Sequence, residues 1–530
     1  MYFIYNNELN ILKVEYRNEN LLIPIVGYEI YHPLNNSKLD LKYCNETIKL
    51  EIPVSINENE LYKYETNSEF YTDNCFSYTS ENGTDIILND RKQEFVDNNL
   101  SLCENKCTYV KYDKNTKQSQ CDCYIKNEID LIYDIIENPN KLSNNFSSEE
   151  SNSINSNILS LKCTKELFSK NGLKNNISSY ILSIIFLLFL SSIVHFLKCG
   201  YPLLEEKIRN IIKIISKNSE INKQTKRAQK KSLPQTKRTR KNFRKNHPPI
   251  RNINFKIINN LNVNKKNHSS LKRINQTTSL GQNKKGNQDL EKKKKGFNLK
   301  LRNNIFELNS LDYKCAILYD KRTCCNYYIS LLKIKHPILF SLIPISDYNS
   351  HIIKLCITSL SFSIYYAINF SFFDDKTIHK IYTDKGKYNF IYFIPKISIS
   401  FVCSYFISLI IKYIFLSERN LSRIRKQQTV LLADKISEKE KKNIIIKYTI
   451  FFILGIIFLA FFWMLLSSFG AVYQNTQFII FENALISYSL SLVYPLFFNI
   501  FPSMLRIHSL ISKKNKKECI YKLSQVLQLL

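Results

Sequence analysis

The stretch that decides the fold is SYILSIIFLLFLSSIVHFLK, residues 179–198, which carries no charge before its last residue. About 20 such residues cross the ~30 Å hydrocarbon layer of a bilayer as a helix. The charge of the chain changes sign here. The residues before this stretch hold 18 Lys and Arg against 27 Asp and Glu, and the remainder holds 57 against 18. An acidic and a basic half on either side of a membrane-length helix predict an outside and an inside.

Four more segments, 352–373, 389–416, 448–469 and 484–505, are long and apolar enough to span. We therefore predict an all-α transmembrane bundle of about five helices in the lipid bilayer. A shorter apolar run, 336–345, contains Pro337 and Pro344 near its two ends. These prolines favour an interfacial or re-entrant segment over a sixth span.

The flanking charges predict the orientation. With the N-terminus outside or lumenal, the inner segments 417–447 and 506–530 hold nine and six Lys and Arg, whereas the outer loops 374–388 and 470–483 hold four and none. This distribution follows the positive-inside rule, so we predict a cytosolic C-terminus in the plasma membrane or a secretory-pathway membrane. No secretory signal is visible at Met1. We expect a missing upstream region; the alternative is a reverse signal-anchor.

Residues 1–137 read as a small, disulfide-bonded, mostly-β ectodomain. Alternating apolar and polar residues at 12–17 and 48–52 predict half-buried strands. The disulfide candidates are Cys44, Cys75, Cys103, Cys107, Cys121, Cys123 and Cys163. Seven is odd, so one thiol is free or pairs elsewhere. The four central cysteines have the inner spacing of an EGF-like module, but the outer ones lie too far away. Close cysteine pairs also suit zinc; the lack of nearby histidine disfavours it.

Sequons make this half a candidate glycoprotein. The glycosylation candidates are Asn35, Asn45, Asn82, Asn99 and Asn145, although such triplets also arise by chance in an Asn-rich chain. We expect Asn176, directly before the first span, to lie too close to the bilayer. Residues 138–178 are predicted to form a flexible stalk, since their first part is rich in Asn and Ser and poor in large apolar residues.

Residues 199–335 are predicted to be a basic, largely disordered cytosolic linker with an amphipathic start. The apolar face of residues 204–215 suits the inner membrane interface, or equally a continuation of the first helix. Residues 220–302 hold 25 Lys and Arg against three acids. Such a charge favours anionic inner-leaflet lipids or an acidic protein, with a solvated tether as the alternative. Nucleic acid is unlikely because interleaved aromatic residues are lacking. Cys199, Cys324 and Cys325 are palmitoylation candidates, or ordinary cytosolic thiols.

The C-terminal membrane module, residues 336–530, offers few ionisable or amide side chains within its spans. Lys396, Asn369 and Asn499 are the weak pore or transport candidates. No Asp or Glu lies in mid-span, which weakens a proton- or sodium-coupled carrier. No pattern indicates a catalytic site, a metal site or a cofactor. We expect the final residues to form a short helix whose face Ile520, Leu523, Leu527 and Leu530 docks on the bundle or on a partner.

Five blocks carry a resemblance: 81–91, 102–107, 321–330, 347–350 and 519–530. They resemble the C-terminal portion of large, uncharacterised multi-pass surface membrane proteins of single-celled eukaryotes. The resemblance implies the same topology and a missing N-terminal ectodomain, and it implies no activity. The function we expect is surface display, adhesion or a receptor-like role toward an unknown extracellular ligand, without catalysis. The alternative is a channel or carrier formed by the C-terminal helices.

Overall fold

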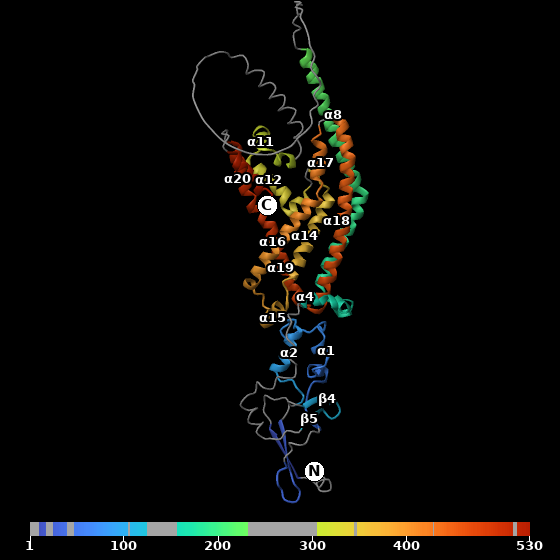
Figure 1. The fold of residues 1–530 in the computed structure, drawn as a ribbon, viewed down its shortest axis with the longest axis vertical. Coiled ribbons are helices and arrows are strands. Elements are labelled where there is room, and N and C mark those ends of the chain that lie inside the picture. The colour runs from blue at the N-terminus through green and yellow to red at the C-terminus, as the bar shows by residue number, and fades with distance from the viewer. Residues whose placement is uncertain are drawn as a thin grey trace, which may run out of the picture.

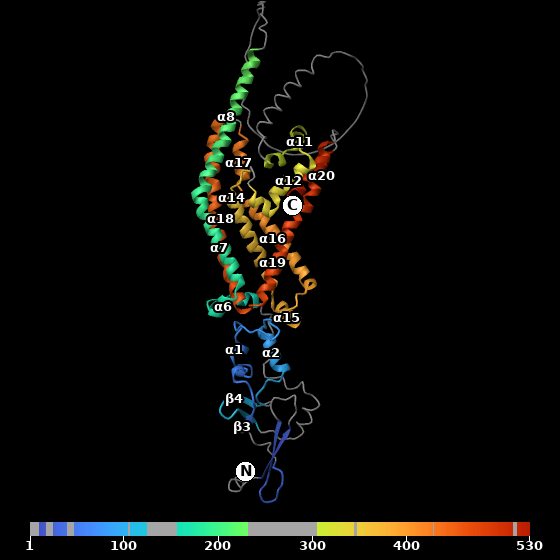
Figure 2. The same ribbon diagram turned by 180° about the vertical axis from the view of Figure 1, so that it is seen from behind.

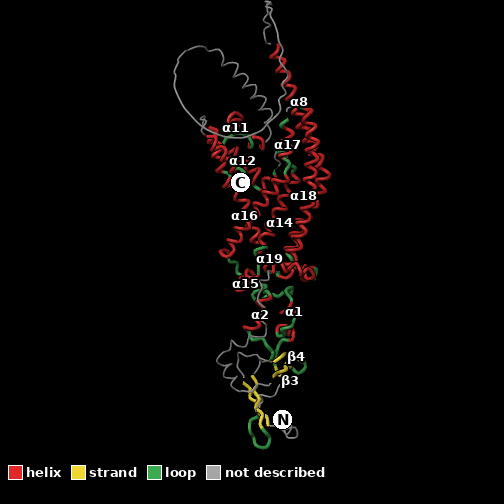
Figure 3. Tube along the Cα trace, in the orientation of Figure 1, coloured by secondary structure: helices red, strands yellow, loops and turns green. Residues whose placement is uncertain are grey.

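The computed structural model is elongated, with the N-terminal strands at one end, long helices in the middle and helices α8, α11 and α20 toward the other end (Figures 1 and 2). The structure describes residues 10–16, 25–39, 47–103, 107–124, 156–231, 305–343, 347–427, 429–511 and 517–529. Within these ranges strands occur only near the N-terminal end (Figure 3). The predicted division into a small strand-bearing domain and a helical module is confirmed at this level.

Five helical stretches are long and apolar enough to cross a membrane, as predicted: Ile177–Lys217, His351–Phe370, Phe390–Arg425, Val430–Val472 and Thr476–Ile511. Their apolar parts are α7 (Ile177–His195), α14 (His351–Phe370), α16 (Phe390–Phe415), α18 (Val430–Val472) and α19 (Thr476–Phe498). The last span begins eight residues earlier than the predicted 484, and α18 starts 18 residues before the predicted 448. Polar residues extend these helices beyond the apolar windows that defined the prediction.

From Ser400 onward, helix α16 is polar on its buried side and apolar on its exposed side. Its buried residues include Ser400, Ser404 and Ser408, and it packs against α14 and α19. Its exposed residues include Ile399, Val402, Phe406, Ile407 and Ile410. Water would favour the opposite arrangement, since apolar surface gains free energy by burial. Small hydroxyl residues between helices and large apolar ones outside are typical of helices in lipid.

The first span continues far past the apolar stretch. A short π-helical turn, Phe196–Gly200, joins α7 to α8 (Tyr201–Lys231), which runs beside the 43-residue α18. The buried apolar residues of α8 are Leu204, Ile208, Ile211 and Ile215. They share a core with α17 (Glu418–Arg425) and α18. The apolar face of residues 204–215 therefore packs on protein, and α8 continues the first helix, which was the alternative to a helix lying in the membrane interface.

The predicted linker, residues 199–335, is also folded at its far end. Four short helices, α10 (Ile305–Asn309), α11 (Tyr313–Tyr319), α12 (Cys324–Lys335) and α13 (Pro337–Leu342), pack beside α20 (Ile500–Ile511), α21 (Glu518–Leu527) and the inner ends of α14 and α19. The 336–345 run is thus a short helix on the bundle as far as residue 343. Residues 232–304, which hold most of the predicted basic segment, lie outside the described residues.

The N-terminal region, predicted to be an ectodomain and called by that name below, holds two small antiparallel sheets. β1 (Asn10–Tyr16) pairs with β2 (Ile25–Tyr31), and β5 (Gln118–Tyr124) lies between β3 (Thr47–Pro53) and β4 (Cys107–Asp113). These strands confirm the ones predicted around residues 12–17 and 48–52. The part nearest the bundle is helical instead, with η2 (Glu58–Lys63), α1 (Glu69–Thr72) and α2 (Leu88–Asp97). The mostly-β prediction therefore holds only for the outer part.

Three disulfides join six of the seven predicted cysteines: Cys103–Cys121, Cys107–Cys123 and Cys75–Cys163. The first two hold the β4–β5 hairpin, where Cys107 stands opposite Cys123 in the strand register. Cys44 lies outside the described residues. The third disulfide closes a loop of 88 residues and reaches the segment predicted to be a stalk.

That segment is not a flexible stalk where the structure describes it. From Ser156 it forms α4 (Ser156–Leu159), η4 (Ser160–Cys163), α5 (Thr164–Leu167) and α6 (Lys170–Lys174), which pack against the outer end of α18. Leu167 and Cys163 are buried. The prediction depended on local composition, whereas a disulfide and tertiary contacts order residues 156–178. Residues 138–155 lie outside the described residues.

Candidate functional site

The turn between α18 and α19 binds the ectodomain through both helix ends. The carboxylate of Asp85 accepts hydrogen bonds from the backbone N–H groups of Asn475 (2.9 Å) and Thr476 (2.7 Å) and from the side-chain amide of Asn475 (3.0 Å). The Ser77 hydroxyl donates to the carbonyl of Val472, the last residue of α18 (2.8 Å). An acidic side chain thus caps the N-terminus of α19, where the helix dipole favours negative charge. We call these contacts the outer joint.

A second set of contacts strengthens the outer joint through α15 (Asp375–Thr383), which connects α14 and α16. His379 Nδ1 lies 2.7 Å from a carboxylate oxygen of Asp90, and the Tyr382 hydroxyl donates to Glu94; both acids belong to α2. Burial raises the pKa of Asp90, and the hydrogen bond from His379 opposes that shift only in part. The apolar side chain of Ile87 joins the same outer core as Phe370 and Phe469. The ectodomain and the bundle therefore share one core.

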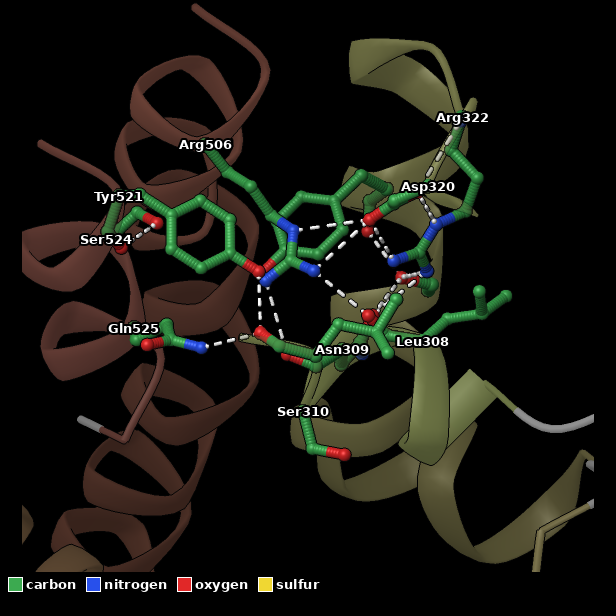
Figure 4. Close-up of polar contacts among 12 residues, drawn as sticks. Leu308, Asn309, Ser310, Asp320, Arg322, Arg506, Tyr521, Ser524 and Gln525 are labelled. Atoms are coloured by element: carbon green, nitrogen blue, oxygen red, sulfur yellow. Dashed lines mark hydrogen bonds and ion pairs between the residues drawn. The ribbon is translucent and has the colours of Figure 1, made fainter. Parts of the chain in front are cut away.

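At the opposite end a buried carboxylate holds two arginines (Figure 4). Arg506 of α20 and Asp320 form an ion pair of 3.0 Å in which neither side chain is exposed. Arg322 donates to both oxygens of Asp320, at 2.8 Å each. Arg506 also donates to the carbonyls of Leu308 (2.8 Å) and Asn309 (3.1 Å). We call this cluster the inner clamp.

The C-terminal helix α21 completes the inner clamp. The Arg506 guanidinium lies 4.7 Å and 4.8 Å from the ring centroids of Tyr327 and Tyr521. The Tyr521 hydroxyl and the side-chain amide of Gln525 both donate to the Leu311 carbonyl, at 2.6 and 2.9 Å (Figure 4). Tyr521 and Ser524 are the buried residues of α21, whereas Leu523 is half exposed. The helix therefore docks on the bundle through Tyr521 and Ser524 and not through the predicted face around Leu523; docking of that face on a partner stays a prediction.

The chemistry of the inner clamp is that of a structural tie. Burial raises the pKa of Asp320, but the hydrogen bonds and charges of Arg322 and Arg506 outweigh it, so the net shift is downward. A carboxylate that is ionised and engaged by two guanidinium groups has little capacity to act as a general base. We assign the inner clamp no catalytic role.

A second polar cluster lies where α8, α14 and α17 meet. Lys354 and Asp347 form a buried ion pair of 2.5 Å. Asn349 donates to Glu418 (2.5 Å), and its side-chain oxygen accepts from the backbone N–H of Ser417 (3.1 Å). The ammonium of Lys207 donates to the Asn349 carbonyl (2.7 Å). We call this cluster the inner network; it fixes α8, which continues the first span, against the bundle.

The three predicted pore residues do not come together. Lys396 lies at the outer end, where its ammonium donates to the Phe372 carbonyl (3.4 Å) and the Tyr392 hydroxyl (3.1 Å). Asn369 bonds to Ser487 of α19 (3.1 Å) and so ties α14 to α19. Asn499 is buried at the break between α19 and α20 and donates back to the Pro495 carbonyl (2.8 Å). Asn369 therefore joins two helices, whereas the bond of Asn499 stays within its own helix.

Sequence reasoning missed a periodic feature of α16. Lys396, Ser400, Ser404, Ser408 and Lys412 follow one another at intervals of four residues, which places them along one ridge of a helix. The three serines are buried, and their hydroxyls have no hydrogen-bond partner among the described residues. The prediction treated Lys396 as a pore candidate and the serines as sites of close helix packing, and it did not connect the two. The repeat itself was the available signal. Arg506 likewise entered the prediction only as one of the six Lys and Arg of residues 506–530.

The modification candidates remain predictions. Asn35 and Asn82 are exposed, and Asn99 is partly exposed. Asn45 and Asn145 lie outside the described residues. Asn176 is fully buried and donates to the Ser467 carbonyl (2.7 Å), which agrees with its exclusion. Cys199 and Cys325 are exposed free thiols, and Cys324 is partly exposed.

In the described part of the chain, no three His, Cys, Asp or Glu side chains are grouped so that they could hold a metal ion. No protein-family model matches the chain, and neither a curated protein nor a solved structure matches it. The resemblance to large surface membrane proteins stays a prediction.

Proposed function

We propose that this chain is a multi-pass surface protein of the adhesion or receptor-like class, with no catalytic activity of its own. In this proposal the ectodomain binds an extracellular ligand and the helices transmit the load or the signal inward. The outer joint is the observation that carries it: Asp85 and Ser77 bind the turn between α18 and α19 directly. A domain used only as a passive spacer would not need contacts to both helix ends.

Helix α18 supplies the link from the outer joint to the other side. Its 43 residues run without a break from Val472 to Val430, a length of about 65 Å. Near its inner end the carboxylate of Glu440 accepts from Asn420 of α17 (2.6 Å). A continuous helix transmits a displacement better than a chain of loops, so a tilt at the outer joint would reach α17 and the inner network.

The proposed orientation places the ectodomain outside the plasma membrane or in the lumen, and the C-terminus in the cytosol. Two features support it. The disulfides belong to the ectodomain, and oxidising compartments favour disulfides. The segments 417–447 and 506–530, which belong to the opposite end, carry the excess of Lys and Arg.

The first test is the orientation and ligand binding of the full chain. A tag ahead of residue 10 should be stained on intact cells, and a tag after residue 530 only after permeabilisation. On an array of surface glycans and matrix proteins, the chain in nanodiscs should then bind at least one class of these molecules. Disulfide reduction should abolish that binding while the helical content stays unchanged. Inverted tag accessibility, or no binding together with ion flux, would contradict the proposal.

The second candidate function is an anion channel or carrier. Its support is the α16 ridge, where buried hydroxyls with no described partner lie between two lysines and no acid interrupts them. Cations at both ends of a hydroxyl-lined helix face favour anions over cations. Chloride flux into proteoliposomes should then fall in Ser404→Leu. Ser398→Leu, on the exposed side of the same helix, is the matched control. Equal flux in both variants, or none in the wild type, would exclude this candidate.

A further inference from the structure

Two lysines at the inner end of the bundle differ from the cations of the inner clamp and the inner network. The ammonium of Lys335, the last residue of α12, is inaccessible to solvent and has no hydrogen-bond partner among the described residues. Lys412, three residues before the end of α16, forms no ion pair with any described residue. Lys354 and Arg506, by contrast, each lie against an Asp.

Lys335 and Lys412 act on each other electrostatically. Burial lowers the pKa of Lys335 to about 8, and the positive charge of Lys412 contributes to the same shift. Burying one unpaired ammonium costs free energy, and a like charge beside it adds to the cost. No described carboxylate offsets either charge by an ion pair. Two such cations favour the binding of an anion.

Aromatic rings shield both lysines without satisfying their N–H groups. The Lys412 ammonium lies 4.9 Å from the ring centroid of Phe340 in α13, and that of Lys335 lies 5.9 Å from the ring of Phe498 in α19. Such cation–π contacts contribute roughly 0.5–2 kcal/mol each and leave donors available for another acceptor. The adjacent His336 is already engaged, since its Nδ1 accepts from the backbone N–H of Leu339 (3.4 Å).

The depth of the pair identifies the kind of anion. Lys396 and Lys412 are 16 residues apart on α16, or about 24 Å along its axis. Lys396 belongs to the outer end, beside Phe372, so Lys412 lies near the opposite limit of a ~30 Å hydrocarbon layer. Helices α12 and α13 pack against α14 and α19 next to it. Phospholipid phosphates are the anions most concentrated at that level.

We propose that Lys335 and Lys412 together bind a phosphate group at the inner surface of the membrane. The head group of an anionic phospholipid carries it at this depth, and free phosphate shares its chemistry. Lysine binds phosphate as a point charge, and basic sites between membrane helices on the cytosolic side suit such head groups. This site is separate from the basic segment 220–302, for which lipid contact was predicted, and it goes beyond the proposed adhesion or receptor-like function.

The test compares the thermal stability of the delipidated full chain in neutral detergent with three additions: short-chain phosphatidylinositol phosphate, short-chain phosphatidylcholine and inorganic phosphate. Binding to the native state alone raises the midpoint of unfolding. We expect a rise with the inositol lipid, none with phosphatidylcholine, and at least tenfold weaker apparent affinity in Lys335→Gln/Lys412→Gln. An equal rise with inorganic phosphate would identify free phosphate as the ligand.

Two controls separate this site from general charge effects. Lys321→Gln removes an exposed lysine beside the inner clamp and should bind the lipid as the wild type does. In detergent without lipid, Lys412→Met should match or exceed the wild type in stability, because it removes an unpaired buried charge. An unchanged lipid response in the double variant, or no response in the wild type, would overturn the proposal. A loss of stability in lipid-free Lys412→Met would also overturn it.

Discussion

Arg506 and Asp320, 186 positions apart in the chain, form an ion pair of 3.0 Å in which neither side chain has any exposure to solvent. The pair joins α20, which continues the last span, to the short helices that precede the second span. The ion pair thus fixes the segment that follows the last span to the segment that precedes the second span. This contact explains why residues 305–335, predicted to belong to a disordered linker, are folded.

Replacing Asp320 tests how much the ion pair contributes to the free energy of unfolding. Asp320→Asn leaves Arg506 and Arg322 buried without a counter-charge, and removing one partner of a buried ion pair costs about 3–5 kcal/mol. We expect a clear fall in the free energy of unfolding, measured in mixed micelles by the fluorescence of Trp463, the one tryptophan of the chain. Asp312→Asn, at an exposed aspartate eight residues earlier, should change it by less than about 0.5 kcal/mol.

The pH dependence of stability should follow the same carboxylate. The pKa of Asp320 is lowered from its ordinary value of 3.8, because the pull of Arg322 and Arg506 exceeds the effect of burial. A lowered folded pKa stabilises the native state fully above the ordinary pKa, and this contribution is lost as pH falls through the folded value. The difference in unfolding free energy between wild type and Asp320→Asn should be constant from pH 7 to 5 and shrink below about pH 4. A difference that grows on acidification would contradict this assignment.

The sequence predicted the parts of the fold that depend on local composition. The five spans follow from apolar windows, and two strands follow from alternation around Leu12 and Leu50. The parts that depend on distant partners were not predictable in this way. The Asn- and Ser-rich first part of residues 138–178 predicted a flexible stalk, yet Cys163 forms a disulfide with Cys75. The apolar window that defined the fourth span began at residue 448, whereas α18 starts at Val430.

The same division applies to the candidate sites. Asn369, Lys396 and Asn499 were identified because polar residues in apolar spans are conspicuous. Asn369 bonds to the neighbouring helix α19, Lys396 donates to the Phe372 carbonyl, and Asn499 bonds within its own helix. The residues of the inner clamp and the inner network lie in ordinary polar sequence, so only the fold reveals them. Four of the five blocks that carry the resemblance nevertheless contain residues of the contacts described above. Block 81–91 belongs to the outer joint, blocks 321–330 and 519–530 to the inner clamp, and block 347–350 to the inner network.

The strength of the outer joint can be measured at one helix end. Asp85→Ala removes the acceptor for the N–H groups of Asn475 and Thr476, and losing a helix cap costs about 0.5–2 kcal/mol. Hydrogen exchange of the first turn of α19 should become faster, while that of α12 at the opposite end should not change. Glu81→Ala, at an exposed acid in the same block, is the control. Unchanged exchange in Asp85→Ala would show that the ectodomain does not cap this helix in solution.

The contact between α7 and α18 depends on the absence of a side chain at Gly455. A Cβ atom placed there would lie 2.4 Å from Cζ of Phe189, closer than two carbon atoms can approach without a shift. Gly455→Ala should therefore reduce the free energy of unfolding by about 1–3 kcal/mol, the usual cost of overpacking. Phe189→Leu shortens the opposing side chain. The loss of unfolding free energy in the double variant should therefore be smaller than the sum of the two single losses by 0.5 kcal/mol or more. Strictly additive costs would mean that Gly455 and Phe189 do not touch, and the packing of the first span against α18 would then need a different register.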